Sequence, residues 1–225
     1  MKKGFTLAEV LITLGVIGIV ASLTLPNVLN NFNNKTQVAQ LQRTYNMLTN
    51  AATQLLADEQ VDDLTQSSLS TAAGRDAFMF KSLKIQKDCG SNPGDCFANS
   101  YQTYTRSETV NMDLNSDKFQ SPLGGQSTDF KCVAVDTGAS ICLSTMNDKY
   151  ARVIVDTNGA ASPNLCGRDL FKFNIFPDGR LGTFNKAAAG EFAMYGSGLN
   201  EYTYCGGFAD GCFDQVVSSG WKMNY

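Results

Sequence analysis

The chain has 225 residues, of which 43% are hydrophobic and 17% charged, a composition typical of one or two folded domains. It contains no histidine, which excludes histidine-based acid–base catalysis and histidine metal sites. The net charge is −3 and the acidic excess lies after residue 58, which disfavours a nucleic-acid-binding protein.

Residues 5–25 form the most apolar segment of the chain, FTLAEVLITLGVIGIVASLTL, with Glu9 as its one charge. A helix of this length can cross the hydrocarbon core of a bilayer. Lys2 and Lys3 precede it and favour a cytoplasmic N-terminus, which puts the rest of the chain on the outer side of the membrane. Two alternatives fit the hydropathy equally: a secretory signal peptide cut near Ala21, and a plain uncleaved membrane anchor.

The string KKGFTLAEVLI at positions 2–12 closely resembles the processing site of type IV pilins and type II secretion pseudopilins. The resemblance implies that a prepilin peptidase cuts between Gly4 and Phe5 and that Phe5 is then N-methylated. Residues 1–4 would therefore be a leader peptide. The resemblance extends to about residue 58 and is weak beyond it.

Glu9 and Pro26 occupy positions that the resemblance assigns to filament assembly. A lone carboxylate costs a few kcal/mol in the bilayer and needs a partner. In the family, that partner is the new amine at Phe5 of a neighbouring subunit. The alternative is that Glu9 lies at the membrane edge and snorkels into water. Pro26 removes a backbone donor, so we expect a kink or a locally melted stretch over residues 22–26.

The helical pattern continues past Pro26 and becomes amphipathic. We expect one long helix over residues 5–58, with 5–25 as the transmembrane and assembly part and 26–58 as the amphipathic part. Its apolar stripe recurs at steps of three and four residues, through Val38, Leu41, Tyr45, Leu48, Ala52 and Leu55. The stripe either pairs with a second copy as a coiled coil or packs on the chain's own head, as the pilin resemblance implies.

Residues 59–225 are predicted to form one globular head. A polar loop is expected over residues 59–70 and a short helix over 72–84. Strands are predicted over residues 131–135, 141–144, 151–155, 171–176 and 180–184. The fold class is therefore α+β, a long N-terminal helix packed on an antiparallel sheet, which is a pilin-like arrangement.

All seven cysteines follow the predicted membrane span, on the side expected to be oxidising. Their spacing suggests three local disulfides, Cys89–Cys96, Cys132–Cys142 and Cys205–Cys212, although spacing alone does not fix the connectivity. Cys166 would remain unpaired or would form a bond between subunits. The spacings do not match those of zinc ligands.

Asp156, Asn158 and Asp169 could supply oxygen ligands to calcium, which major pseudopilins often hold in a loop near the sheet. The spacing does not fit an EF-hand, so we favour a turn in which Asp and Asn cap their own backbone, with no cofactor. No nucleophile elbow, phosphate-binding loop or dinucleotide fingerprint is present, so the chain is predicted not to be an enzyme.

The sequence therefore predicts a structural subunit of a type IV pilus-like or type II secretion pseudopilus filament. It would be a single-pass protein of the bacterial inner or cytoplasmic membrane, with its head in the periplasm or outside the cell. The expected partners are other pilin-like subunits, prepilin peptidase and an assembly ATPase with its platform. Nucleic acid is not expected as a partner. The alternative function is that of a membrane-anchored extracellular binding or enzymatic domain that forms no filament.

Overall fold

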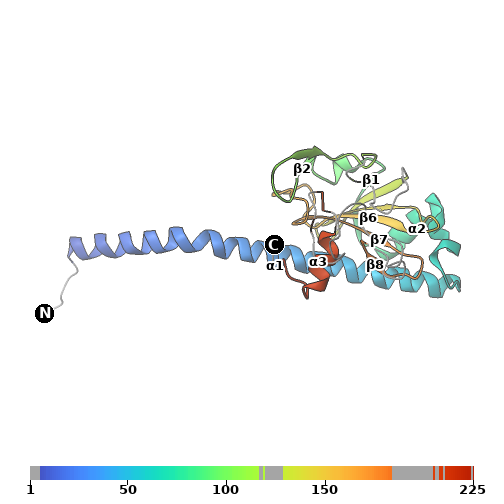
Figure 1. The fold of residues 1–225 in the computed structure, drawn as a ribbon, viewed down its shortest axis with the longest axis horizontal. Coiled ribbons are helices and arrows are strands. Elements are labelled where there is room, and N and C mark those ends of the chain that lie inside the picture. The colour runs from blue at the N-terminus through green and yellow to red at the C-terminus, as the bar shows by residue number, and fades with distance from the viewer. Residues whose placement is uncertain are drawn as a thin grey trace, which may run out of the picture. The chain divides into compact units, whose positions relative to one another are not determined.

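The computed structural model describes residues 6–116, 119, 129–183, 205, 208–209, 211–223 and 225. The chain divides into two compact units, Met1–Thr36 and Gln37–Tyr225. Helix α1 (Leu7–Glu59) contributes its first part to one unit and its remaining part to the other. The long helix expected from the sequence is thus present, and it ends at Glu59 (Figure 1).

The first unit contains the apolar part of α1 and extends to Thr36. Leu7–Pro26 is long and apolar enough to cross a membrane, with a mean hydropathy of 2.1, and none of it is buried. Residues 22–26 are helical, so the melted stretch that Pro26 allows is not found in this part of the helix. The side-chain hydroxyls of Thr13, Ser22 and Thr24 donate to backbone carbonyls three or four residues earlier, which hides their polarity within the helix.

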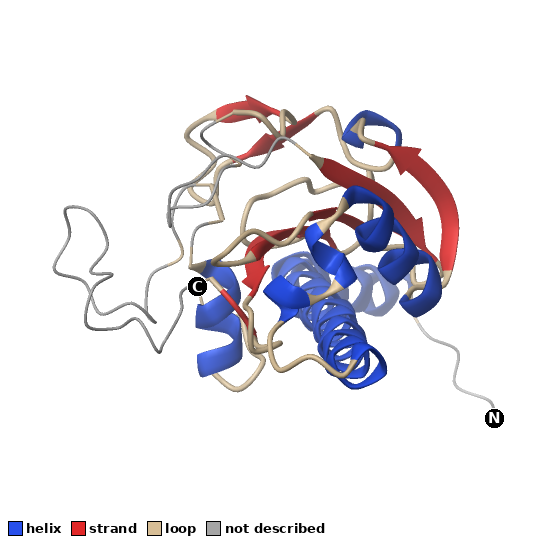
Figure 2. Cartoon of the chain, turned by 90° about the vertical axis from the view of Figure 1, so that its right-hand side faces the viewer, coloured by secondary structure: helices blue, strands red, loops and turns tan. Residues whose placement is uncertain are grey.

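The second unit is built on a six-stranded antiparallel sheet in the order β1-β4-β5-β6-β7-β8. Its strands are β1 (Ile85–Gly90), β4 (Phe130–Val135), β5 (Ser140–Ser144), β6 (Ala151–Asp156), β7 (Leu170–Ile175) and β8 (Leu181–Gly182). Every residue of β5, β6 and β7 is buried, as expected for strands that are covered on both faces. Figure 2 shows the strands curving over the helices of this unit.

Two smaller groups of elements complete the second unit. The two-stranded sheet pairs β2 (Ser100–Gln102) with β3 (Thr109–Asn111). The remaining helical elements are α2 (Ala72–Ser82), α3 (Cys212–Ser218), and the 3-10 turns η1 (Leu64–Gln66), η2 (Ser68–Ser70) and η3 (Pro93–Asp95). Residues 59–70, expected to be loop, therefore hold η1 and η2, whose starts are capped by Asp63 and Ser67.

The apolar stripe of α1 lies in the core of the second unit. Val38, Leu41, Leu48 and Ala52 are buried, and Tyr45 and Leu55 pack against the same core. The head of the same chain thus covers the stripe, and the coiled-coil alternative is not supported. An aromatic cluster joins the stripe to the C-terminal segment, because Tyr45 lies 5.3 Å from Trp221, centroid to centroid.

Candidate functional site

The described part of the N-terminal motif begins with a capping box at Thr6 and Glu9. The backbone N–H and the hydroxyl of Thr6 both donate to Oε2 of Glu9, each at 2.8 Å. The backbone N–H of Glu9 donates in return to the Thr6 hydroxyl at 3.3 Å. These reciprocal bonds satisfy donors that the first turn of a helix leaves without partners. They explain why α1 starts at Leu7.

The same contacts supply the polar partners that Glu9 needs on an apolar helix. A carboxylate at the N-terminus of a helix also lies at the positive end of the helix dipole. Thr6 thus supplies hydrogen-bond donors to Glu9 from its own chain, and the ionic pairing with the Phe5 amine of another subunit stays a prediction. The sequence reasoning did not use Thr6, although the spacing Thr-x-x-Glu is the signature of this motif. Gly4 and Phe5 lie outside the described residues.

The surface of the span is otherwise apolar and open. Its large side chains are exposed, for example Ile12 at 67% and Leu23 at 69%. A Cβ placed on Gly15 or Gly18 would meet nothing within 4 Å. Such a face is suited to lipid or to the close approach of another helix.

Comparison with known proteins adds one finding on this segment. Residues 1–25 match the family model of the prokaryotic N-terminal methylation motif. This chain carries a prepilin-type N-terminal methylation motif. The motif supports a type IV pilin- or pseudopilin-like precursor, and it fits a single-pass, membrane-anchored protein. No curated protein and no solved structure matches the chain.

The match covers residues 1–25 and does not extend into the head. The head follows the long apolar helix with an antiparallel sheet, so the whole chain has a pilin-like α+β fold. Three features of the head bear on function: the proposed calcium ligands, the cysteines and the charged groups around α2.

The proposed calcium ligands form a buried hydrogen-bonded junction. Asp156 accepts hydrogen bonds from the hydroxyl of Tyr101 and from the backbone N–H of Asn158. Asp169 accepts the N–H groups of Asn164 and Leu165, at 2.7 and 2.6 Å. Donors therefore occupy all four carboxylate oxygens. These bonds are those of a turn that caps its own backbone, and a calcium ion would have to share the same oxygens.

The environment of this junction raises the pKa of both carboxyl groups. Burial raises the pKa of Asp169 to about 6, although the N–H donors oppose the shift. Burial and then the neighbouring Asp169 raise the pKa of Asp156 well above its usual value. The side chain of Asn158 donates to the carbonyl of Ser162, as in a turn. Among the described residues, no group of three or more Asp, Glu, Cys or His side chains could hold a metal.

Six of the seven cysteines form three disulfides. The bonds join Cys89 to Cys96, Cys132 to Cys142, and Cys205 to Cys212, the same pairs that the spacing suggested. Cys132 and Cys142 face each other across β4 and β5, so this bond staples the hairpin. Cys166 takes part in none of the three and is buried. A bond from Cys166 to another subunit would therefore require its loop to open.

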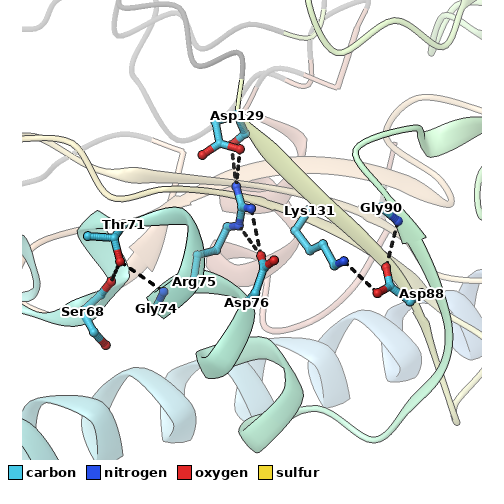
Figure 3. A network of polar contacts seen from close by, with 9 residues as sticks. All are labelled: Ser68, Thr71, Gly74, Arg75, Asp76, Asp88, Gly90, Asp129 and Lys131. Carbon is cyan, nitrogen blue, oxygen red and sulfur yellow. Dashed lines mark hydrogen bonds and ion pairs between the residues drawn. The ribbon is translucent and has the colours of Figure 1, made fainter.

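The charged groups around α2 are satisfied by one another. The guanidinium of Arg75 is 4% exposed and pairs with both Asp76 and Asp129, each at 2.8 Å. Lys131 on β4 pairs with Asp88 on β1 at 2.7 Å, and Figure 3 shows this pair beside the two ion pairs of Arg75. These contacts tie α2, β4 and β1 together, which is a structural role.

A groove lies between the end of α1 and α2. Its lining includes the apolar side chains of Leu55 and Phe78 and the ion pair Lys81–Asp58 at 2.6 Å. The groove offers apolar surface and paired charges, which is a packing surface more than a catalytic one.

Proposed function

We propose that this chain is a structural subunit of a type IV pilus-like filament or a type II secretion pseudopilus. The observation that carries the proposal is the methylation motif at residues 1–25, placed at the start of an uninterrupted apolar helix. Prepilin peptidase would cut between Gly4 and Phe5, and Phe5 would be N-methylated. The motif points to a structural subunit and not to an enzyme.

The proposed assembly proceeds through α1. Cleavage creates a cationic amine at Phe5, and Glu9 is the single acid of the span. A subunit that enters the filament would place its Phe5 amine against Glu9 of a neighbour, which removes an unpaired charge from the apolar interior. Because Thr6 already donates to Glu9, the carboxylate is oriented before its neighbour arrives.

The remaining partners follow from this proposal. The chain would enter the inner or cytoplasmic membrane with its N-terminus in the cytoplasm, as Lys2 and Lys3 favour. The head would lie in the periplasm or outside the cell, which agrees with its three disulfides. An assembly ATPase and its membrane platform would supply the energy to extract the subunit.

The mature N-terminus tests the proposal directly. The full chain is expressed with prepilin peptidase, purified in detergent and digested, and its N-terminal peptide is identified by mass spectrometry. We expect a peptide that starts at Phe5 and is one methylene heavier than its sequence predicts. The same expression without the peptidase should leave Met1 in place. A peptide that starts near Ala21, or an intact Met1 in both cases, would refute the proposal.

A further inference from the structure

The groove between the end of α1 and α2 has the size of a single aromatic ring. Its volume is about 170 Å³. A cavity of about 150 Å³ is enough to hold a benzene ring, whereas sites for drug-sized ligands start at about 300 Å³. The apolar part of its lining comes from both helices, through Ala51, Leu55, Ala77 and Phe78. The occupant that fits this groove is therefore one apolar side chain.

Phe80 is the one large apolar side chain that the described part of the second unit exposes, at 52%. It belongs to α2, the helix that also forms one wall of the groove. The α2 residues of that wall share one helix face, through Ala77, Phe78, Lys81 and Ser82. Phe80 is two positions from Phe78, about 200° around the helix, so it points away from that face. A chain therefore cannot place Phe80 in its own groove.

The surface around Phe80 offers a lysine that forms no ion pair. The Nζ of Lys131 lies 5.6 Å from the centre of the Phe80 ring, and Asp88 pairs with this lysine. Lys84 follows Phe80 by four residues and is exposed. Asp136 donates its backbone N–H to the Lys84 carbonyl, but no ion pair joins Lys84 to this or any other acid in the described part of the chain.

The border of the groove offers carboxylates. Asp58 is paired with Lys81 at 2.6 Å. Glu59 also lines the groove and accepts hydrogen bonds from Ser68, but among the described residues it forms no ion pair. Asp62 follows three residues later, is exposed, and has no ion pair there either. An exposed ring with a lysine nearby and an apolar groove with acids at its edge are complementary in charge.

We propose that Phe80 of one copy of this chain enters the groove between α1 and α2 of a second copy. Lys84 of the first copy then faces Glu59 and Asp62 of the second. Because the ring and the groove lie on different sides of α2, each copy offers its ring to one neighbour and its groove to another. Such a contact can repeat along a filament, and in that role the inference rests on the proposed function.

Photo-crosslinking from position 80 tests the contact in the full chain. The photoreactive residue p-benzoylphenylalanine replaces Phe80, the chain is expressed in a bacterial membrane with prepilin peptidase, and the membranes are irradiated. We expect a product of twice the chain's mass, in which residue 80 is joined to a peptide from residues 51–59. The control places the same photoreactive residue at Lys149, which is exposed on the turn between β5 and β6. Crosslinks to other proteins alone, or equal yields from both positions, would overturn the proposal.

Filling the groove tests the other half of the contact. Ala77 is exposed and lines the groove, so Ala77→Leu adds apolar volume there without entering the core, and leucine is a good helix former. We expect the crosslink from position 80 to fall at least fivefold in this variant. Ala72→Leu changes an exposed residue of α2 outside the groove lining and should keep the original yield. A yield that Ala77→Leu leaves unchanged would show that the ring does not enter the groove.

The N-terminal peptide of the same sample separates this contact from the proposed function. We expect both the crosslink and a methylated terminus at Phe5. A crosslink in a chain that retains Met1 would refute the prepilin-type subunit and would support the contact between membrane-anchored copies. A methylated Phe5 terminus without the crosslink would overturn the contact and leave the proposed function standing.

Discussion

Thr6 and Glu9 are bonded to one another in both directions at the start of α1. Thr6 donates its backbone N–H and its hydroxyl to the Glu9 carboxylate, and Glu9 donates its backbone N–H to the Thr6 hydroxyl. One acid thus has two tasks in the proposed filament. It caps its own helix in the single subunit, and it offers a negative charge to a neighbour. The two tasks make different demands on the side chain, so they can be separated by mutation.

Replacing Thr6 with Val tests the capping task. The change keeps the shape and charge of the segment but removes the hydroxyl, and lost caps cost about 1 kcal/mol. We expect amide hydrogen exchange in the first turn of α1, measured in detergent, to become about fivefold faster. A loss of about 1 kcal/mol in the stability of this turn corresponds to that factor. Thr6→Ser retains the hydroxyl and should exchange like the wild type. Equal exchange rates in the wild type, Thr6→Val and Thr6→Ser would mean that the capping box does not stabilise the first turn of α1.

Replacing Glu9 with Gln tests the charge. A glutamine side chain can still accept the Thr6 hydrogen bonds, as glutamine does in other capping boxes. It has no charge to pair with an amine. We expect Glu9→Gln to insert into the membrane and to exchange like the wild type, while recovery of sheared filaments falls at least tenfold. Wild-type filament yield from this variant would exclude the ionic pairing.

The parts of the fold that were predictable are those with a strong local pattern. The apolar run and the three-four stripe through Leu41 and Leu48 define α1, and the β-branched run at residues 151–155 lies within β6. Both patterns depend on a single periodicity within one segment. The cysteine pairs were also suggested by spacing, because each bond is local in sequence.

The missed parts depend on contacts between segments far apart. Strand β1 reads IQKDCG, which is largely polar, and it is a strand because it lies at the edge of the sheet and pairs with β4. The hydrogen bond from Tyr101 to Asp156 spans 55 positions, so no local sequence pattern could predict it. Helix α3 is only seven residues long and was not predicted. The predicted last strand shrinks to Leu181–Gly182, and Phe184 lies outside the described residues.

Gly74 should not tolerate a larger side chain. It lies in α2, where a Cβ would come within 2.0 Å of the backbone carbonyl oxygen of Ser68. That oxygen belongs to η2 and cannot rotate away like a side chain. We expect Gly74→Ala to destabilise the head by about 1–3 kcal/mol, the usual cost of overpacking, measured by urea unfolding of the full chain in detergent. Gly94→Ala, where the nearest atom is a side-chain oxygen of Asn92 at 3.3 Å, should cost much less.

The stability of the head should increase as the pH falls toward 5. The folded pKa of Asp169 is raised to about 6 from 3.8, so the folded head binds a proton more tightly than the unfolded chain does. The gain is complete below the unfolded pKa and is lost as the pH rises through 6, with a full size of about 3 kcal/mol. Asp156 shifts in the same direction, partly because of the Asp169 charge, so Asp169→Asn removes the effect of Asp169 and weakens the one at Asp156. We expect urea unfolding between pH 4.5 and 8 to show a weaker pH dependence in Asp169→Asn than in the wild type.

The control variant Asp178→Asn, which removes a surface ion pair with Arg180, should retain the wild-type dependence of stability on pH. A profile in Asp169→Asn that parallels the wild type would show that this carboxyl group titrates normally in the folded head.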